Sequence, residues 1–156
     1  MTITILRDYT LNDVVRELAR MLREGTMLPE TRQLALEVIS QHEDQISAIY
    51  DFVKENVLYQ PDPYQVELFI HPRRMIEFYY QGIARGDCDD IALITASLLR
   101  SLGYQANIVL LDTRGQGIDH AVTEVTLGGV RIMVDSSSSY LPLGWEESSF
   151  DKVEVS

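Results

Sequence analysis

The stretch GDCDDIALITASLLRSL, from Gly86 to Leu102, decides the fold of this chain. From Ile91 onward it is apolar with almost no polar face, which predicts a central helix that is buried on all sides. Cys88, the only cysteine of the chain, stands just before this apolar run. A helix that begins at Cys88 places its sulfur near unpaired N–H groups at the positive end of the helix dipole, which favours the thiolate.

Three aspartates lie around this cysteine. The negative charges of Asp87, Asp89 and Asp90 oppose thiolate formation, so a basic partner for the sulfur becomes more important. We interpret these aspartates mainly as capping residues and solvated charges, because carboxylates suit the first turn of a helix. A metal site that joins them to His120 is an alternative without regular ligand spacing, and it predicts that chelators abolish activity.

The rest of the chain divides into helical patterns before this stretch and extended patterns after it. Apolar spacing predicts helices over 11–24, with Gly25 as the stop, and over 29–40, 44–56 and 72–80. Apolar runs rich in β-branched residues predict strands over 105–111, 120–127 and 130–135. Residues 57–64 are expected to be extended, and the tail from 140 to 156 receives no element.

The last two predicted strands form a hairpin whose register can be worked out. With Gly128-Gly129 as the whole turn, Leu127 opposes Val130. Counting back along both strands makes His120 and Asp135 diagonal neighbours on one face, within reach of a side-chain hydrogen bond. A slip of one residue would put them on opposite faces. The other face is more apolar, so we expect it to pack on the core while the histidine face opens to a cleft.

Cysteine, histidine and aspartate in this order can form a catalytic triad. Cys88 would be the nucleophile, His120 the base that takes the thiol proton, and Asp135 the carboxylate that orients the imidazole. Acyl transfer also needs donors for an oxyanion. The backbone N–H of Cys88 is one candidate, and Tyr80 and Gln81, in the segment before it, are candidates for the second.

Composition excludes several classes of protein. The chain has 156 residues with 46% hydrophobic content, which is enough for one domain with a core. The net charge of −11 disfavours nucleic acid and anionic membranes as partners, since both need a basic surface. A single cysteine cannot form an internal disulfide, and neither a signal peptide nor a transmembrane segment is visible. We therefore expect a cytoplasmic protein.

Several motifs resemble those of the transglutaminase-like superfamily. They are VLYQPDP at 57–63, GDCDD at 86–90, LLRSLGY at 98–104, HAVTEV at 120–125 and Val134-Asp135. The resemblance runs from about residue 46 to residue 136. In particular, the chain looks like the small bacterial and phage-encoded members of the family. Two departures lie beside the aspartate. Met133 and Val134 stand where members often carry Leu and Trp, and Ser136 to Ser139 replace the common Pro-Thr.

The resemblance implies a fold and a domain organisation. The fold would be α+β and papain-like, with N-terminal helices and a cysteine-bearing central helix packed on an antiparallel sheet that carries histidine and aspartate. The chain would be one transglutaminase-like domain over 1–156, with a helical part at 1–56, a catalytic core at about 57–139 and a tail at 140–156.

The resemblance also implies a reaction. Cys88, His120 and Asp135 would act as the triad of a cysteine-dependent amide hydrolase or acyl transferase, through a thioester and without a metal or organic cofactor. The substrate would be a protein or peptide amide, and we favour hydrolysis because cross-linking needs a cleft that excludes water. The alternative is a non-catalytic binding or phage assembly module on the same fold, which would have an assembly protein as partner and would be virion-associated if phage-encoded. The oligomeric state is left open.

Overall fold

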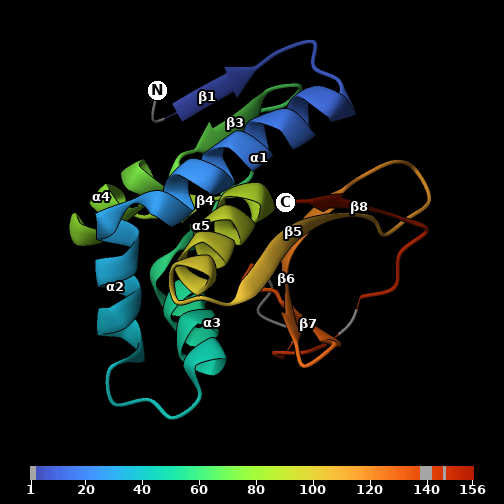
Figure 1. Ribbon diagram of the computed structural model, residues 1–156. Coiled ribbons are helices and arrows are strands. Elements are labelled where there is room, and N and C mark those ends of the chain that lie inside the picture. The colour runs from blue at the N-terminus through green and yellow to red at the C-terminus, as the bar shows by residue number, and fades with distance from the viewer. Residues whose placement is uncertain (1–2, 138–141, 146) are drawn as a thin grey trace.

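Helices gather on one side of the molecule and a four-stranded sheet lies on the other (Figure 1). The computed structural model describes residues 3–137, 142–145 and 147–156. Its helices are α1 (Leu11–Met27), α2 (Pro29–Ile39), α3 (Gln45–Asn56), α4 (Pro72–Tyr80) and α5 (Cys88–Ser101). Its strands are β1 (Ile3–Leu6), β2 (Leu58–Tyr59), β3 (Glu67–Ile70), β4 (Arg85–Gly86), β5 (Gln105–Asp112), β6 (His120–Leu127), β7 (Val130–Val134) and β8 (Asp151–Val155).

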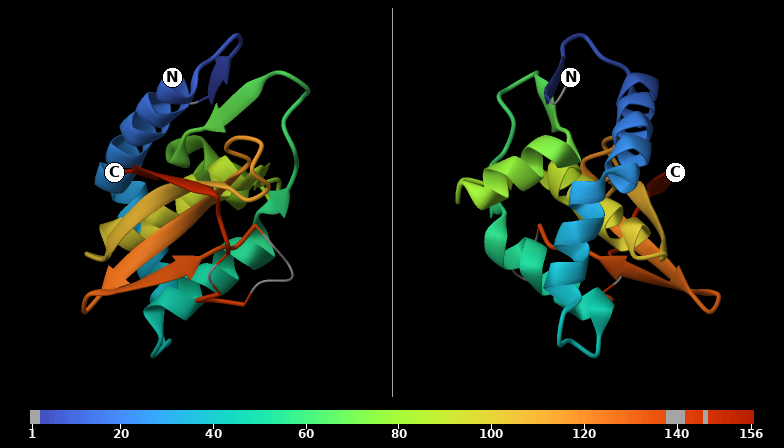
Figure 2. Two further views of the ribbon diagram at one scale, coloured as in Figure 1. Left: turned by 90° about the vertical axis from the view of Figure 1, so that its right-hand side faces the viewer. Right: turned by 60° about the vertical axis from the view of Figure 1, so that its left-hand side comes forward.

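Helix α5 is the centre of the fold, as its sequence predicts. Every residue from Asp89 to Leu99 is buried, and the other helices and the sheet pack around it (Figure 2). The helix begins at Cys88 because Asp87 is an N-cap whose side chain accepts hydrogen bonds from the amides of Asp89 and Asp90. Within the described ranges, no helix combines the length and apolarity needed to cross a membrane.

The four-stranded sheet is antiparallel, with the strand order β7-β6-β5-β8. The register of its hairpin is the predicted one, since Leu127 pairs with Val130 and Thr123 pairs with Val134. Gly128 and Gly129 have φ angles of 58° and 81°, which a two-residue turn of this kind requires. The hairpin therefore presents its side chains on the faces that the sequence predicts.

One face of this hairpin covers α5. Ala121 and Val125 are buried in the core, and the Thr123 hydroxyl donates to the Ala92 carbonyl of α5 at 2.8 Å. The opposite face does not open widely to a cleft, contrary to the prediction. It is closed by a small buried cluster consisting of Val109, Leu111, Val122 and Met133. Only the end of this face, at His120, reaches a cavity.

Three strand pairings join parts of the chain that are distant in sequence. β8 lies in the C-terminal tail, for which no helix or strand was predicted. It pairs with β5 and places Val155 opposite Ile108. β1 pairs with β3 in a separate antiparallel ribbon. The short β2 pairs with β4 in parallel, and this places Tyr59 opposite Gly86, two residues before Cys88.

Gly25 is not the stop of the first helix, as the sequence had suggested, because α1 continues to Met27. The residue is buried, and a Cβ atom added to it would lie 2.8 Å from the Ser97 hydroxyl and 2.9 Å from Cβ of Pro72. Glycine at this position thus allows α1, α4 and α5 to approach closely.

Candidate active site

A cavity of about 590 Å³ lies where the start of α5 meets the start of β6. Cys88 and His120 both line it. So do Tyr59 from β2 and residues of the loops that precede β3 and β6. The amide of Ala121, the residue after His120, donates a hydrogen bond to the Cys88 sulfur. Strand β6 therefore holds the thiol beside the histidine's own backbone.

His120 and Asp135 are hydrogen-bonded, as the hairpin register predicts. Nε2 of His120 lies 2.7 Å from Oδ2 of Asp135, and the two side chains are 19% and 7% exposed. Burial favours the neutral acid of Asp135, but hydrogen bonds from His120 and Ser137 outweigh it and lower its pKa. Asp135 is thus a carboxylate and Nε2 is the donor, so Nδ1 is the nitrogen left to receive a proton.

The thiol of Cys88 does not have the acidity that its place at a helix start suggests. Burial raises its pKa, and the charges of Asp89 and Asp87 raise it further, while the Ala121 amide acts in the opposite direction. The effect of the helix start is therefore outweighed, because the same aspartates that cap the helix are close to the sulfur. Proton removal must depend on a base.

Two of the three aspartates around Cys88, Asp87 and Asp90, are capping residues, as predicted, but none of the three is solvated. Asp87, Asp89 and Asp90 are 8%, 9% and 1% exposed. Asp90 closes a capping box with the amide of Asp87 at 3.1 Å and also accepts the amide of Ile70 at 2.8 Å. The β3 segment and the loop before it cover these carboxyl groups, which sequence spacing could not show.

Carboxyl groups form one wall of the cavity. The side chains of Asp62 and Asp87 are in contact, and so are those of Glu67 and Asp89. Burial raises the pKa values of Asp87 and Asp89, and the neighbouring carboxylates raise them further. These groups consequently hold protons to higher pH than free aspartates do.

The sequence match to a known family covers the central part of this site. Residues 32–142 match the model of the transglutaminase-like superfamily. The chain belongs to this superfamily. The match includes Cys88, His120 and Asp135. A search of curated proteins finds no match to the chain.

Solved structures of distant relatives share the fold of this transglutaminase-like chain. A candidate cysteine protease from Cytophaga hutchinsonii matches with a TM-score of 0.56 and 16% identity, over 97% of the chain and 61% of that protein. A candidate protease from Parabacteroides distasonis matches with a TM-score of 0.52 and 13% identity, over 79% of the chain and 26% of that protein. EGTA-treated LapG from Legionella pneumophila matches with a TM-score of 0.50 and 20% identity, over 83% of the chain and 73% of LapG.

These matches confirm the expected α+β fold with a transglutaminase-like core. The chain spans about a quarter of the Parabacteroides protein and 61% of the Cytophaga protein. At such identities the likeness establishes the fold and leaves the chemistry to the site itself.

The serines after Asp135, where this chain departs from the family pattern, hold the aspartate in place. The amide and hydroxyl of Ser137 donate to Oδ1 of Asp135 at 3.0 and 2.6 Å. The hydroxyl of Ser136 donates to the carbonyl of Tyr50 on α3 at 2.9 Å. The polar run was visible in the sequence, but its contacts were not; Ser138 and Ser139 lie outside the described residues.

Tyr80 and Gln81, the predicted oxyanion donors, are not brought to Cys88. Tyr80 is 62% exposed at the end of α4, and its hydroxyl lies 3.5 Å from Glu37 of α2. The Gln81 amide is bound to carbonyls of α4. Neither residue is among the described residues that line the cavity. The Cys88 amide remains in position, since an N–H in the first turn of a helix has no intrahelical acceptor.

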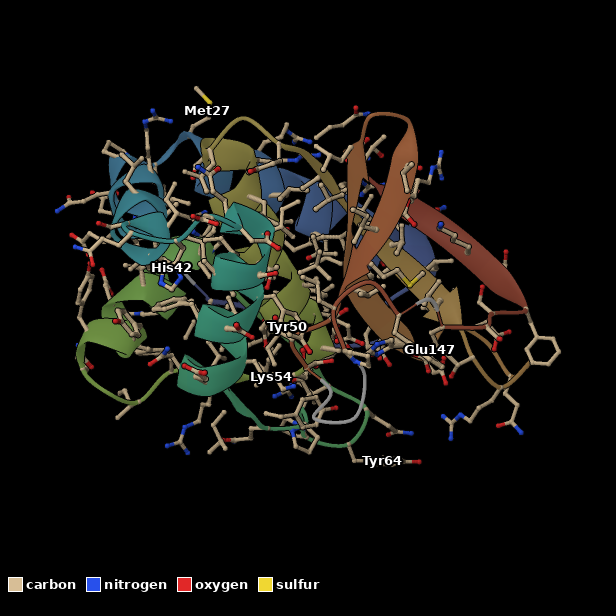
Figure 3. The ribbon with its side chains drawn as sticks, turned by 90° about the horizontal axis from the view of Figure 1, so that it is seen from below. Met27, His42, Tyr50, Lys54, Tyr64 and Glu147 are labelled. Carbon is tan, nitrogen blue, oxygen red and sulfur yellow. The ribbon has the colours of Figure 1, made fainter. Side chains whose placement is uncertain are left out.

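Sequence reasoning missed one charged neighbour of His120. Oε2 of Glu147 lies 3.8 Å from Nε2 of His120, on the same side as Asp135, although this tail segment has no recognisable pattern. Glu147 lies close to the strands of the main sheet in Figure 3. Among the residues that the structure describes, two groups of side chains are close enough to hold a metal ion: His120 with Asp135 and Glu147, and Asp62 with Glu67 and Asp87. Neither group is the predicted set of three helix-start aspartates with His120.

Proposed function

We propose that this protein is a cysteine-dependent acyl-transfer enzyme that acts on an amide of a protein or peptide. The observation that carries the proposal is the hydrogen bond between His120 and Asp135 at the edge of a cavity that also holds Cys88. It supplies a base oriented by a carboxylate, with Nδ1 free, beside the only thiol of the chain. Similarity to candidate cysteine proteases supports the same class of reaction.

The reaction would proceed through a thioester. As the sulfur of Cys88 attacks the amide carbon, Nδ1 of His120 takes the thiol proton and the carbonyl electrons move to oxygen. The Cys88 amide donates to that oxyanion. The intermediate then collapses, the C–N bond breaks, and His120 returns the proton to the departing amine. Water attacks the thioester with His120 again as base, which releases the acid and restores the thiol.

The test measures acyl transfer to Cys88 with p-nitrophenyl acetate and intact-protein mass spectrometry. The acetyl group should appear on the wild-type protein and be absent after Cys88→Ala. Replacing His120 by alanine should slow acetylation by about 10²- to 10⁴-fold, the usual contribution of a general base. Circular dichroism would show that both variants are folded. An acetylation rate that is unchanged in folded His120→Ala would overturn the proposal.

Hydrolysis and transamidation are separated by the acyl acceptor. We propose hydrolysis as the main reaction, because most of the side chains that line the cavity near Cys88 and His120 are polar or charged, which suits water as the acyl acceptor. Incubation with a casein digest should then generate new carboxyl groups or free amines. Incorporation of a fluorescent primary amine at a higher rate than hydrolysis would instead indicate a transglutaminase.

A non-catalytic module is the second candidate, and one observation favours it. Burial and two aspartates raise the pKa of Cys88, as expected for a thiol that no longer reacts. Such a module would bind an assembly or phage protein with the same fold. It predicts that wild type and His120→Ala are acetylated at the same slow rate, whereas an enzyme predicts a large difference between them.

A further inference from the structure

Two carboxylates face the same nitrogen of His120. Asp135 reaches Nε2 from the end of β7 at 2.7 Å, and Glu147 reaches it from the C-terminal segment at 3.8 Å. The side chain of Glu147 is 35% exposed, so this carboxylate lies between His120 and solvent-accessible surface, unlike the 7% exposed Asp135. Both contacts are made by Nε2, which leaves Nδ1 as the ring nitrogen that can accept the thiol proton.

We propose that Glu147 is a positioning residue that acts through His120: with Asp135 it holds the imidazole ring and stabilises the ring while it carries the thiol proton. The role in catalysis rests on the function proposed above. The contact itself does not, because it is a property of the folded chain.

The environment of the thiol explains why a second carboxylate matters. Cys88 is partly buried and lies next to Asp87 and Asp89, so its proton leaves only if the acceptor binds it strongly. Proton affinity must therefore come from the histidine. A negative charge 3.8 Å from Nε2 supplies part of it, since the imidazolium formed in the reaction is cationic.

The charges that face His120 come from three directions. Asp135 and Glu147 lie at Nε2. Asp119 is the residue before His120, and the Cys88 thiol of α5 lines the same cavity. Burial acts against protonation of His120, but Asp135, Glu147 and Asp119 outweigh it and raise its pKa. Asp119 is itself bound to Thr113 and Arg114, which leaves Glu147 as the main support for Asp135.

The first measurement follows the titration of His120 by NMR, which needs no substrate. The chain has three histidines, so the signal of His120 is assigned by its loss in His120→Ala. The isosteric change Glu147→Gln removes the charge and should move the His120 midpoint to lower pH. The matched control Glu43→Gln removes one charge from an exposed loop and should leave the midpoint in place.

The second measurement follows acetylation of Cys88 against pH. Because the base must be neutral to accept a proton, a lower pKa of His120 in Glu147→Gln should extend the acidic limb of the profile to lower pH. The plateau rate should fall by roughly twofold to fivefold, the effect of one partly exposed ion pair. A residue that only stabilises the fold would lower the rate without moving the limb.

The outcomes separate this inference from the proposed function. A shifted midpoint of His120 in Glu147→Gln supports the contact even if no acetylation occurs, and in that case only the enzymatic proposal fails. A His120 midpoint equal to that of wild type, in a folded Glu147→Gln protein, overturns the inference whatever the activity. An acidic limb that stays in place while the midpoint moves also overturns the catalytic part.

Discussion

At the scale of single residues, Asp135 is held on both of its carboxylate oxygens. Oδ2 binds His120, and Oδ1 accepts both the amide and the hydroxyl of Ser137. An aspartate with one oxygen fixed in this way cannot rotate away from the imidazole. Ser137 therefore contributes to the geometry of the site without touching the reacting atoms.

This arrangement predicts the effect of Ser137→Ala. Losing a hydroxyl that donates to a carboxylate should lower the rate of Cys88 acetylation about tenfold, because hydrogen bonds to charged groups are among the stronger ones. The thermal midpoint should change little. The matched control Ser149→Ala removes an exposed hydroxyl and should be without effect. An unchanged rate in Ser137→Ala would mean that the Ser137 amide and His120 are enough to hold Asp135.

The pair of His120 and Asp135 could be predicted from the sequence, whereas the setting of Cys88 could not. The pair depends only on a two-glycine turn and on counting along two adjacent strands, which is local information. The burial of Cys88 depends on Tyr59, Asp62 and Glu67, which reach the cavity from another part of the chain. The contact of Glu147 likewise arises from a segment without periodicity.

At the scale of elements, the five helices were predicted and several strands were not. The helices have local signals, such as the Thr10 capping box of α1 and the apolar run of α5. Strands β1 and β8 are short and gain stability only from partners that are 61–67 and 39–47 residues away in the chain. A sequence pattern carries no information on such pairings, so they become visible only in the folded structure.

The close packing of α1 predicts the effect of Gly25→Ala. Alanine would favour an isolated helix by about 1 kcal/mol. Here its Cβ would collide with Pro72 and Ser97, so we expect a net loss of about 1–3 kcal/mol in the free energy of unfolding. Urea denaturation would measure it. The control is Gly25→Ala in a Pro72→Ala background, where the cost should be smaller; an equal cost would place the strain elsewhere.

At the scale of the whole molecule, buried acids should make stability fall as pH rises. Asp87, Asp89 and Asp90 have pKa values raised by burial, with their acidic neighbours contributing at Asp87 and Asp89. The folded chain keeps protons on these carboxyl groups at pH values where the unfolded chain has released them, that is, above the ordinary aspartate pKa near 3.8. The free energy of unfolding therefore decreases with pH from that value up to the raised pKa values.

Other groups limit this trend. Asp135 has a lowered pKa, so its contribution is lost as pH falls below the ordinary value. Burial lowers the pKa of His71, which adds stability as pH rises through the ordinary range of histidine. We accordingly expect the highest stability in mildly acidic solution.

Asp89→Asn tests the contribution of the buried acids. In urea denaturation at pH 8 the variant should be more stable than wild type by on the order of 1–3 kcal/mol, and its stability should depend less on pH. Glu43→Gln makes the same change of formal charge at an exposed position, and it controls for general self-repulsion. Equal effects of both substitutions would show that total charge, rather than burial, governs the trend.

The charge of the whole molecule should also select the reagents that reach Cys88. The net charge is −11, and besides Asp87 and Asp89, which hold their protons, five aspartate and glutamate residues line the cavity, with no lysine or arginine among the described lining residues. A negative potential of this kind concentrates cations near the thiol and repels anions. The single cysteine makes the reaction easy to follow, because any thiol modification is at Cys88.

We therefore expect the trimethylammonium methanethiosulfonate reagent to modify Cys88 at least about tenfold faster than the sulfonate reagent, after division by their rates with a free thiol. Added salt should reduce the ratio, since it screens charges beyond a Debye length of about 10 Å at 0.1 M. Glu67→Gln should reduce the ratio more than Glu43→Gln, because only Glu67 faces the cavity. Equal normalised rates for the two reagents would show that the carboxyl wall is protonated or turned away from the thiol, and the preference for cationic ligands would then be lost.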